Sequence, residues 1–416
     1  MQINETITAI DIGTTKICTI LARKVNGEFP EVIAHSVVPC SGLKKGNVEN
    51  INLTSQAISS SLAEIREKTS SPIDSAYIGI TGSHIDFDNR VDTLDGIGRH
   101  GVITTDEVEK IPQLISRGLE SYGRNVIHTM PSTYRIDGYN GISNPVGMHA
   151  NGVEVTSHVV SAGSSFVKNL EDSVTSAGIG VKQMVLEPLA SSEAILSAKQ
   201  KEKGAAIVDI GGGTTDIVAF KKGSITYTSV IPVGGFQFTN DICLTYNTTF
   251  SEAEGIKLRY GTTEPSTVDM RETIGAQVMD SNVRSSINRR DLCQLIRERS
   301  MELIRLIDLK LQESGLRENL EADVVITGGA SGLPGFFQMA QKYMPNCNIK
   351  MGLPFHLSGM SKELDAPAYS TGVGILLYAS RQERSIEKNK HINTRGVNSD
   401  GGGLISRIRG LFDTHN

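Results

Sequence analysis

The sequence predicts an α/β protein made of two similar halves that face each other across a cleft. A short apolar strand followed by an acid, glycines and hydroxyls occurs twice, at residues 7–16 and again at 205–216. A third apolar strand, residues 323–327, also leads directly into glycines. Because one supersecondary unit that recurs half a chain apart indicates internal duplication, we expect two related domains that share one site.

The first half opens on the first repeat and then alternates between helix and strand patterns. Its further predicted elements are helices at 53–68 and 166–176 and a strand at 75–79. The helical segments place apolar residues at intervals of three and four, whereas the strand is a short apolar run. We expect the first domain to comprise residues 1–82 and 158–195.

Residues 83–157 interrupt this alternation with a polar, glycine-rich stretch. The stretch has a helical pattern of its own at 106–119, preceded by Thr104 and Thr105. Either threonine is suited to begin this helix, because a hydroxyl before the first turn accepts a free backbone N–H. Since the pattern of the first half resumes afterwards, we expect an inserted subdomain.

The second half follows a helical segment, residues 189–201, which bridges the two halves. Its other predicted elements are helices at 251–260 and 291–313 and the strand at 323–327. We expect the second domain to comprise residues 196–230 and 306–380, and residues 231–305 to form a subdomain of their own.

The character of the chain changes after residue 380. Residues 381–403 are polar and charged, which predicts a flexible tether because this composition cannot bury a core. The last segment, residues 404–416, predicts an amphipathic helix that binds a membrane surface, with its arginines facing anionic lipid. Docking of this helix on the body or on a partner is the alternative. Its apolar face and flanking charges are Leu404, Ile405, Arg407, Ile408, Arg409, Leu411 and Phe412.

Composition argues against several classes of protein. The 416 residues carry a net charge of −5, which disfavours a nucleic-acid-binding body. The 5 cysteines are scattered without a C-x-x-C pair, which favours a reducing cytosol over a zinc site or a disulfide framework. No apolar run approaches the ~18 residues of a membrane-spanning helix, so we expect any membrane contact to be peripheral.

The two repeated loops have the chemistry of a phosphate site. Glycines let several backbone N–H groups approach one anion, and threonine hydroxyls add donors. Asp11 and Asp209 end the two strands, and a carboxylate beside a triphosphate is favourable only through a hard cation, so we expect both to face Mg²⁺ through water. Lys16 is placed to neutralise phosphate charge. Either loop alone could be an ordinary glycine turn, and their repetition favours the site. The other predicted contacts are Gly13, Thr14, Thr15, Gly211, Gly212, Gly213, Thr214, Thr215 and Asp216.

A third loop completes the expected nucleotide cleft. The apolar strand before it runs into Gly328, Gly329 and Ala330, whose bare backbone would let a base or ribose lie flat against it. Gly234 and Gly235 follow an Ile-Pro-Val run and would let the chain pass close to the nucleotide. A plain turn is the alternative for this glycine pair.

This order of loops resembles the actin, Hsp70 and sugar-kinase superfamily, and within it the sequence is most similar to FtsA, the actin-like division proteins of bacteria. The resemblance covers nearly the whole chain. It implies an actin-like, two-lobed α/β fold of duplicated ribonuclease-H-like domains, with an SHS2-like inserted subdomain of the FtsA type and a C-terminal amphipathic helix. The first loop departs slightly, because Thr15 stands where the family more often has serine. The motifs that carry the resemblance are residues 11–16, 186–191, 209–216 and 253–257.

The resemblance adds three site residues. Glu254 and Lys257 lie three apart on one predicted helix face, and the family pattern implies ribose and adenine contacts for them. A solvated ion pair is the alternative. Glu187 would orient the water that attacks ATP, whereas the alternative is a hinge residue with no chemical role. ATP is therefore expected to act mainly as an assembly switch, with slow turnover at most.

The resemblance also implies partners and location. An FtsA-like protein would form head-to-tail filaments with itself on the cytoplasmic side of the membrane, at the division septum. It would bind the C-terminal tail of FtsZ, through the subdomain at 231–305, and other divisome proteins through the inserted subdomain. A PilM-like component of a pilus or secretion assembly platform shares this subdomain and is the main alternative, followed by an MreB-like filament. The amphipathic C-terminal segment favours FtsA.

Overall fold

Two five-stranded sheets form the centre of the computed structural model, which describes residues 5–25, 29–98, 101–119, 123–279, 283–319 and 321–397. The first sheet contains β1 (Thr6–Ile12), β2 (Lys16–Arg23), β3 (Glu31–Pro39), β6 (Ser75–Ile80) and β11 (Gly180–Leu186). The second contains β12 (Ala205–Ile210), β13 (Thr215–Lys221), β14 (Ser224–Ile231), β17 (Asp323–Thr327) and β18 (Asn348–Met351).

The two sheets have the same topology. Their strand orders are β3-β2-β1-β6-β11 and β14-β13-β12-β17-β18. In each sheet the first three strands of the chain form an antiparallel meander, and the two later strands run parallel to the first. The predicted duplication within an α/β fold is confirmed.

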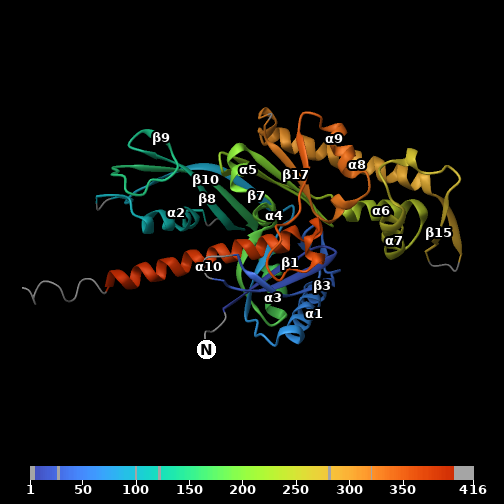
Figure 1. Cartoon of the computed structure of the whole chain (residues 1–416), viewed down its shortest axis with the longest axis horizontal. Coiled ribbons are helices and arrows are strands. Elements are labelled where there is room, and N and C mark those ends of the chain that lie inside the picture. The colour runs from blue at the N-terminus through green and yellow to red at the C-terminus, as the bar shows by residue number, and fades with distance from the viewer. Residues whose placement is uncertain are drawn as a thin grey trace, which may run out of the picture.

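Helices cover the outer faces of both sheets (Figure 1). On the first sheet these are α1 (Ile51–Thr69) and α3 (Ser164–Ser176), and on the second α8 (Arg289–Glu313) and α9 (Phe336–Tyr343). Ile58, Leu62 and Ile65 of α1 are fully buried against the apolar side chains of the first sheet. The helical spacing of apolar residues that predicted α1 therefore reflects the burial of one face.

Two helices lie between the sheets, α4 (Glu187–Ile195) and the start of α10 (Ser370–Val397). They share one core cluster with both sheets, in which Leu189 of α4 and Ile375 of α10 are buried. The two helices pack very closely, because a Cβ at Gly374 would stand 1.9 Å from the carbonyl oxygen of Ala190. This arrangement brings the N-terminal ends of both helices to the cleft.

The single helix predicted at 189–201 is wrong. The structure divides it into α4, which ends at Ile195, and α5 (Ala198–Lys203). Ser197 begins α5 with a capping box, in which its hydroxyl accepts from the backbone of Gln200 and the Gln200 side chain accepts in return. Such a cap favours a new helix start over continuation of the old helix.

The inserted subdomain is a four-stranded sheet with one helix on it. Its elements are β7 (Ile85–Leu94), α2 (Thr105–Arg117), β8 (Arg124–Ile136), β9 (Tyr139–Ile142) and β10 (Val153–Gly163), in the strand order β7-β10-β8-β9. Thr104 is the residue that begins α2, again with a capping box. The subdomain contacts the second half, where the rings of Phe87 and Tyr227 meet edge to face at 5.3 Å.

A second subdomain projects from the other half, on the right in Figure 1. It consists of α6 (Gly235–Tyr246), α7 (Phe250–Tyr260), β15 (Thr273–Gln277), β16 (Arg284–Asn288) and the beginning of α8. Helix α8 runs through the boundary expected at 305/306, so this subdomain and the second sheet share one rigid helix. The short remaining elements are β4 (Leu43–Lys44), β5 (Asn47–Val48), η1 (Pro265–Thr267), η2 (Leu316–Glu318), η3 (Gly329–Gly332), η4 (Lys362–Asp365) and η5 (Pro367–Tyr369).

The flexible tether predicted from residue 381 is wrong for its first part, because α10 continues to Val397 and projects from the body (Figure 1). Glu383 fixes this helix to the first half. Its buried carboxylate accepts from Tyr77 Oη at 2.7 Å and from Lys24 Nζ at 3.0 Å, and it also pairs with Lys182. Residues 398–403 and the segment 404–416, which is predicted to bind a membrane, lie outside the described residues. Within the described part of the chain, no helix has the length and apolar character needed to cross a bilayer.

Candidate functional site

The two predicted phosphate loops have the same local geometry. In the first, between β1 and β2, Gly13 N–H donates to the Lys16 carbonyl at 3.0 Å. In the second, between β12 and β13, Gly211 N–H donates to the Thr214 carbonyl at 2.9 Å. Each loop is therefore a tight turn that closes an antiparallel hairpin and begins two residues after a buried aspartate.

The loops face each other across the cleft at a distance that only glycine allows. A Cβ at Gly213 would stand 2.4 Å from Thr14 Oγ1, and one at Gly212 would stand 2.8 Å from Thr15 Cγ2. The second loop is also fixed from behind, because Gly235 N–H at the start of α6 donates to the Gly211 carbonyl at 2.9 Å. The turns are thus held in place before any ligand binds.

Two neighbouring cavities of about 80 Å³ and 440 Å³ contain nearly all of the predicted site residues. The smaller cavity is lined by both loops and by the third, glycine-rich loop after β17. Its predicted members are Asp11, Gly13, Thr14, Thr15, Lys16, Glu187, Asp209, Gly211, Gly212, Gly213, Thr214, Asp216, Gly328 and Gly329. The larger cavity adds Gly235, Glu254, Lys257 and Ala330.

Two predicted contacts line neither cavity. Thr215 is fully buried, and its hydroxyl donates to the Val233 carbonyl at 2.8 Å. Gly234 lies against the second loop instead, where a Cβ would stand 2.7 Å from the Gly211 carbonyl oxygen. Both residues support the loop from the side away from the cavities.

Four buried carboxylates meet at the smaller cavity: Asp11, Glu187, Asp209 and Asp216. Burial, reinforced by the neighbouring carboxylates, raises the pKa of Asp11 and of Asp216 to about 7 and the pKa of Glu187 well above its usual value. A divalent cation would relieve this repulsion, so the donor set fits Mg²⁺. Among the described residues, no three His, Cys, Asp or Glu side chains converge as direct metal ligands. Phosphate and water would therefore supply most of the coordination.

Lys16 projects from the first loop onto Tyr369. Its Nζ lies 3.6 Å from the centre of that ring, a cation–π contact. Burial is the main cause that lowers the pKa of Lys16. A phosphate in the smaller cavity would give this partly desolvated ammonium group an ionic partner.

The larger cavity has an aromatic wall and one internal ion pair. Phe236 and Phe250 stack with ring centres 4.7 Å apart. Lys257 Nζ lies 2.7 Å from the Glu254 carboxylate and donates to Thr239 Oγ1 at 2.9 Å. The lysine side chain is only 12% exposed, so this pair belongs to the cavity wall and is not fully solvated.

Several cavity residues had not been predicted from the sequence. They include Gly46, Thr81, Phe236, Phe250, Leu333, Pro334, Pro367, Ala368 and Thr371. Thr81 lies two residues after the strand predicted at 75–79, and this position is a weak signal that could have suggested it. The apolar members are indistinguishable from core residues in the sequence, because only the fold shows which of them border a cavity.

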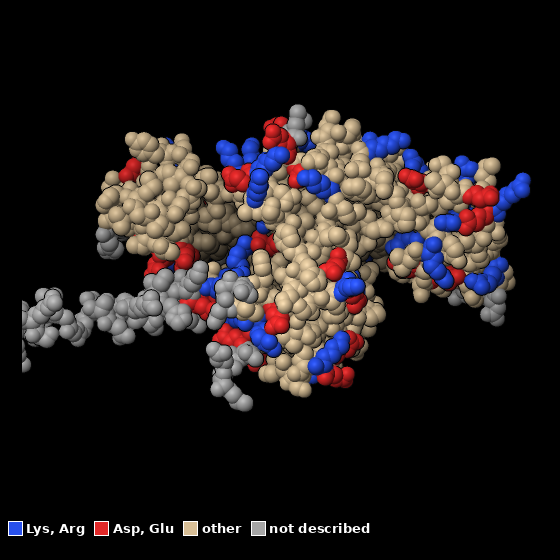
Figure 2. Space-filling model, in the orientation of Figure 1, with Lys and Arg blue, Asp and Glu red and all other residues tan. Residues whose placement is uncertain are grey.

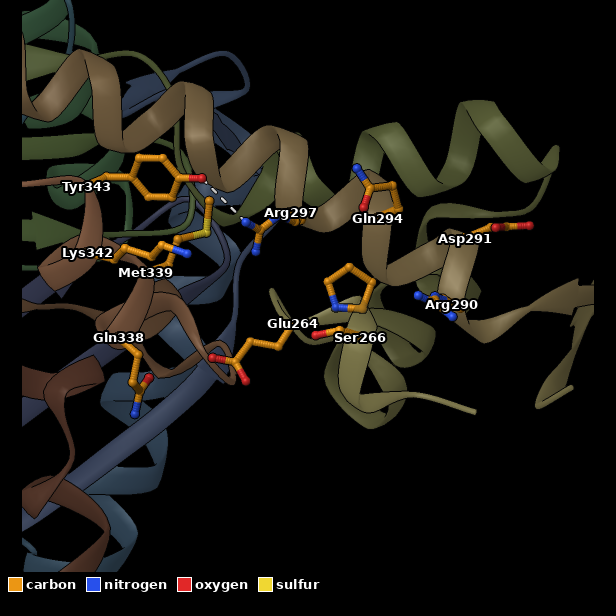
Figure 3. Close-up of a pocket in the computed structure, with 11 residues that line it drawn as sticks. Glu264, Ser266, Arg290, Asp291, Gln294, Arg297, Gln338, Met339, Lys342 and Tyr343 are labelled. Atoms are coloured by element: carbon orange, nitrogen blue, oxygen red, sulfur yellow. Dashed lines mark hydrogen bonds between the residues drawn. The ribbon is translucent and has the colours of Figure 1, made fainter. Parts of the chain in front are cut away.

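A separate hollow of about 670 Å³ lies between α8, α9 and η1, away from the loops (Figure 3). Arg290 and Arg297 approach it from α8, and Lys342 approaches it from α9. Arg297 donates to the Thr263 carbonyl at 3.0 Å and contacts Tyr343 Oη at 3.4 Å. Within the described part of the chain, neither Arg290 nor Lys342 forms an ion pair, so both charges can meet an anionic ligand.

Comparison with protein families finds two matches that together span most of the chain. Residues 206–374 match the family described as cell division protein FtsA. Residues 82–161 match the SHS2 domain inserted in FtsA. The second match covers the four-stranded subdomain, so the predicted insertion of the FtsA type is confirmed.

Individual proteins support the same grouping. The chain is 33% identical to the cell division protein FtsA of Pseudomonas aeruginosa over 392 residues, which cover 92% of this chain and 91% of the relative. Among solved structures, the PilM–PilN type IV pilus biogenesis complex matches with a TM-score of 0.63 at 17% identity, over 91% of this chain and 99% of that one. MreB5 of Spiroplasma citri bound to ADP matches with a TM-score of 0.53 at 12% identity, over 92% and 98%. These two likenesses show an actin-like fold.

Proposed function

This chain belongs to the FtsA family of actin-like cell-division proteins, and we propose that it binds Mg²⁺–ATP between its halves and anchors FtsZ filaments to the cytoplasmic membrane. One observation carries the nucleotide part of this proposal. Two turns of the same geometry, each following a buried aspartate, face one small cavity from opposite halves of the molecule. Such a pair of turns can hold the phosphates of one ligand from both sides.

In this proposal the phosphates occupy the smaller cavity and the nucleoside occupies the larger one. Backbone N–H groups and threonine hydroxyls of both loops bind phosphate oxygens, and Lys16 adds a positive charge. Mg²⁺ supplies the remaining positive charge beside Asp11 and Asp209. The base lies by the aromatic wall, with Glu254 and Lys257 near the ribose.

Glu187 is our candidate for orienting the water that attacks ATP. It begins α4, lines the phosphate cavity and is buried beside Asp11. Burial and the nearby carboxylates raise its pKa, so it is a better proton acceptor than an exposed glutamate. Turnover is slow at most, because ATP here acts mainly as a switch for assembly. Because α4 also packs between the sheets, the alternative is that Glu187 is a hinge residue between the halves and has no chemical role.

A binding measurement tests the cleft assignment. Gly212→Val and Asp209→Ala each change the phosphate cavity and should abolish Mg²⁺-dependent binding of a fluorescent ATP analogue. Gly152→Ala is the control, because a Cβ at Gly152 meets nothing within 4 Å and lies in the inserted subdomain. If both cavity variants fold and bind the nucleotide as the unmodified chain does, the cleft assignment is rejected.

The hollow beside α8 and α9 is our candidate for the FtsZ tail. It lies next to the subdomain that projects from the second half. Arg290 and Lys342 line it and form no ion pair among the described residues, and the acidic Glu264 and Asp291 line it as well. A short peptide with acidic side chains would fit this hollow, because charge pairs at a rim guide binding and fix the register.

Charge reversal tests this assignment. Arg290→Glu with Lys342→Glu should weaken the binding of a labelled FtsZ C-terminal peptide at least tenfold in fluorescence anisotropy. Lys199→Glu, an exposed change on α5, is the matched control. If the double variant and the control bind the peptide equally well, the hollow is not the FtsZ site. This result would not affect the proposed nucleotide site.

We further propose head-to-tail filaments on the membrane and contacts with other divisome proteins through the inserted subdomain. Figure 2 shows few charged side chains on the visible face of that subdomain, at the left, compared with the mixed charges over the rest of the molecule. A weakly charged surface of this kind suits protein contacts better than contacts with anionic lipid. Filament formation by electron microscopy on a lipid layer, with ATP, tests assembly.

A further inference from the structure

Two hydroxyl groups and one carboxylate from three distant parts of the chain meet beside the phosphate cavity. Thr371 Oγ1, in the first turn of α10, donates to Asp209 Oδ2 at 3.0 Å. Ser191 Oγ, in α4, donates to the same carboxylate oxygen. The two hydroxyl oxygens are 3.0 Å apart. All three residues are buried, at 0% exposure for Ser191, 6% for Asp209 and 9% for Thr371.

These contacts determine which oxygen of Asp209 remains for a ligand. Both hydroxyls bind Oδ2, whereas Oδ1 lies against the backbone of Gly328, where a Cβ would stand only 2.3 Å away. A carboxylate held at one oxygen by two donors cannot rotate freely about its last torsion. Oδ1 therefore keeps one orientation beside Gly328, and Asp209 and Gly328 both line the smaller cavity.

Hydroxyl donors also favour the charged form of a buried carboxylate. Ser191 and Thr371 supply two such donors to Asp209. Groups that orient a metal-facing side chain in this way commonly change metal affinity by ~10-fold to 100-fold when they are removed.

We propose that Ser191 and Thr371 are positioning residues of the metal site, which hold Asp209 in the orientation that binds the hydrated Mg²⁺ of the nucleotide complex. This inference rests on the proposed binding of Mg²⁺–ATP. The competing explanation is purely structural, in which the hydroxyls only join α4 and α10 to the second sheet. The two explanations differ in what they predict when the metal is absent.

The experiment measures the dissociation constant of ADP by calorimetry, once with saturating Mg²⁺ and once with a chelator. Thr371→Val and Ser191→Ala should each weaken binding about tenfold with Mg²⁺ and leave binding in the chelator unchanged. Thr371→Ser retains the hydroxyl and should restore the affinity with Mg²⁺. A thermal unfolding curve of each variant establishes that it folds.

Adjacent residues provide matched controls. Ser192 is next to Ser191 and fully buried, but its hydroxyl donates to the Leu189 carbonyl at 2.7 Å. Ser370 precedes Thr371 and its hydroxyl contacts Thr327 Oγ1 at 2.8 Å. Ser192→Ala and Ser370→Ala should leave the effect of Mg²⁺ on affinity unchanged.

Three results would overturn the inference. The first is equal weakening with and without Mg²⁺, and the second is failure of Thr371→Ser to restore affinity, since both indicate a structural role. The third is unchanged affinity in Thr371→Val and Ser191→Ala while the unmodified chain binds Mg²⁺–ADP, which would leave the proposed function standing. If the unmodified chain binds no nucleotide at all, the proposed function fails and this inference fails with it.

Discussion

Thr81 Oγ1 donates a 2.5 Å hydrogen bond to Asp216 Oδ1 and so joins the two halves across the floor of the cleft. Thr81 follows β6 of the first sheet, and Asp216 belongs to β13 of the second. The other oxygen of Asp216 accepts from Thr214 Oγ1 at 3.0 Å. Asp216 is only 3% exposed, so these hydroxyls replace water around a carboxylate that burial makes hard to ionise.

Thr81→Val should lower the free energy of unfolding of the ligand-free protein by about 1–3 kcal/mol. The reason is that a buried carboxylate would lose one of its donors while the shape of the side chain is kept. Urea denaturation measures the change, and Thr81→Ser should recover most of it. Thr93→Val, an exposed change on β7, should stay within ~0.5 kcal/mol of the unmodified protein. If Thr81→Val is as mild as this control, the bond does not hold the halves together.

Glu383→Gln should release the outer part of α10 from the first half. The buried carboxylate meets Tyr77, Lys24 and Lys182, and these hydrogen bonds outweigh burial and lower the pKa of Glu383 to about 2. Replacing this carboxylate removes a partner from Tyr77 and from both lysines, although Lys24 keeps Glu5 and Glu387, and costs about 1–3 kcal/mol. Hydrogen exchange should increase in residues 378–390.

The control for this change is Glu387→Gln. Glu387 is 42% exposed and touches only Lys24 of the same cluster, at 3.0 Å. Replacing Glu387 should therefore change hydrogen exchange in residues 378–390 only slightly. Identical exchange in the Glu383→Gln variant and the unmodified protein would mean that packing between α4 and α10 alone positions the helix.

His128 and His158 should each reduce the stability of the folded protein as the pH falls from about 6.5 towards 4, whereas Asp11 and Asp216, whose pKa burial raises to about 7, should increase it over the same range. Burial is the main cause that lowers the pKa of His128 and of His158 to about 4. In the unfolded chain a histidine has a pKa of ~6.5, so below that pH the unfolded state binds more protons than the folded state. Within this window, each of these histidines lowers the free energy of unfolding by about 1.4 kcal/mol for every unit by which the pH falls.

His128→Gln isolates one of these contributions. His128 Nε2 accepts from Leu186 N–H at 3.0 Å, and a glutamine carbonyl can accept the same bond. As the pH falls from 6 to 5, the histidine of the unmodified protein removes roughly 1.4 kcal/mol from the free energy of unfolding, and the variant should lack this loss. His356→Gln replaces an exposed histidine and should leave the slope of stability against pH as it is. Equal slopes in all three proteins would contradict the prediction.

The segment 404–416, which lies outside the described residues, should decide membrane binding. The five apolar side chains on one face of the predicted helix should each give roughly 1 kcal/mol on partial burial in the membrane surface. The conformational entropy lost when the segment becomes helical offsets much of this gain. A single copy should bind weakly, and a filament strongly through avidity. Phe412→Asp or Leu411→Asp should abolish vesicle flotation, because either change removes apolar burial.

The charge contribution can be separated from the apolar one. Arg407→Ala with Arg409→Ala should reduce flotation chiefly on anionic vesicles and at low salt, because only the electrostatic attraction is lost. Neutral vesicles provide the internal comparison. Full binding by a chain that ends at Gly403 would contradict the anchoring role of this segment.

Local sequence was sufficient to predict the duplicated fold and most of the cleft. A phosphate turn depends on the order of acid, glycine and hydroxyl within about six residues, so it can be recognised wherever the chain places it. The repeat at Asp11 and Asp209 predicted two matching hairpins, which the structure has. The break at Ser197 was also visible locally, as a Ser-x-x-Gln capping box, and had not been recognised.

Only the tertiary structure shows the features that depend on contacts between residues far apart in the sequence. A hydroxyl at Thr81, Ser191 or Thr371 becomes part of the site only because folding places it beside a carboxylate 135, 18 or 162 positions away. The same reason explains α10: its polar sequence between 381 and 397 resembles a tether, but Lys24, Tyr77 and Lys182 of the first half converge on Glu383. Burial of that carboxylate among three donors stabilises the continuation of α10 beyond residue 381, which composition alone does not favour.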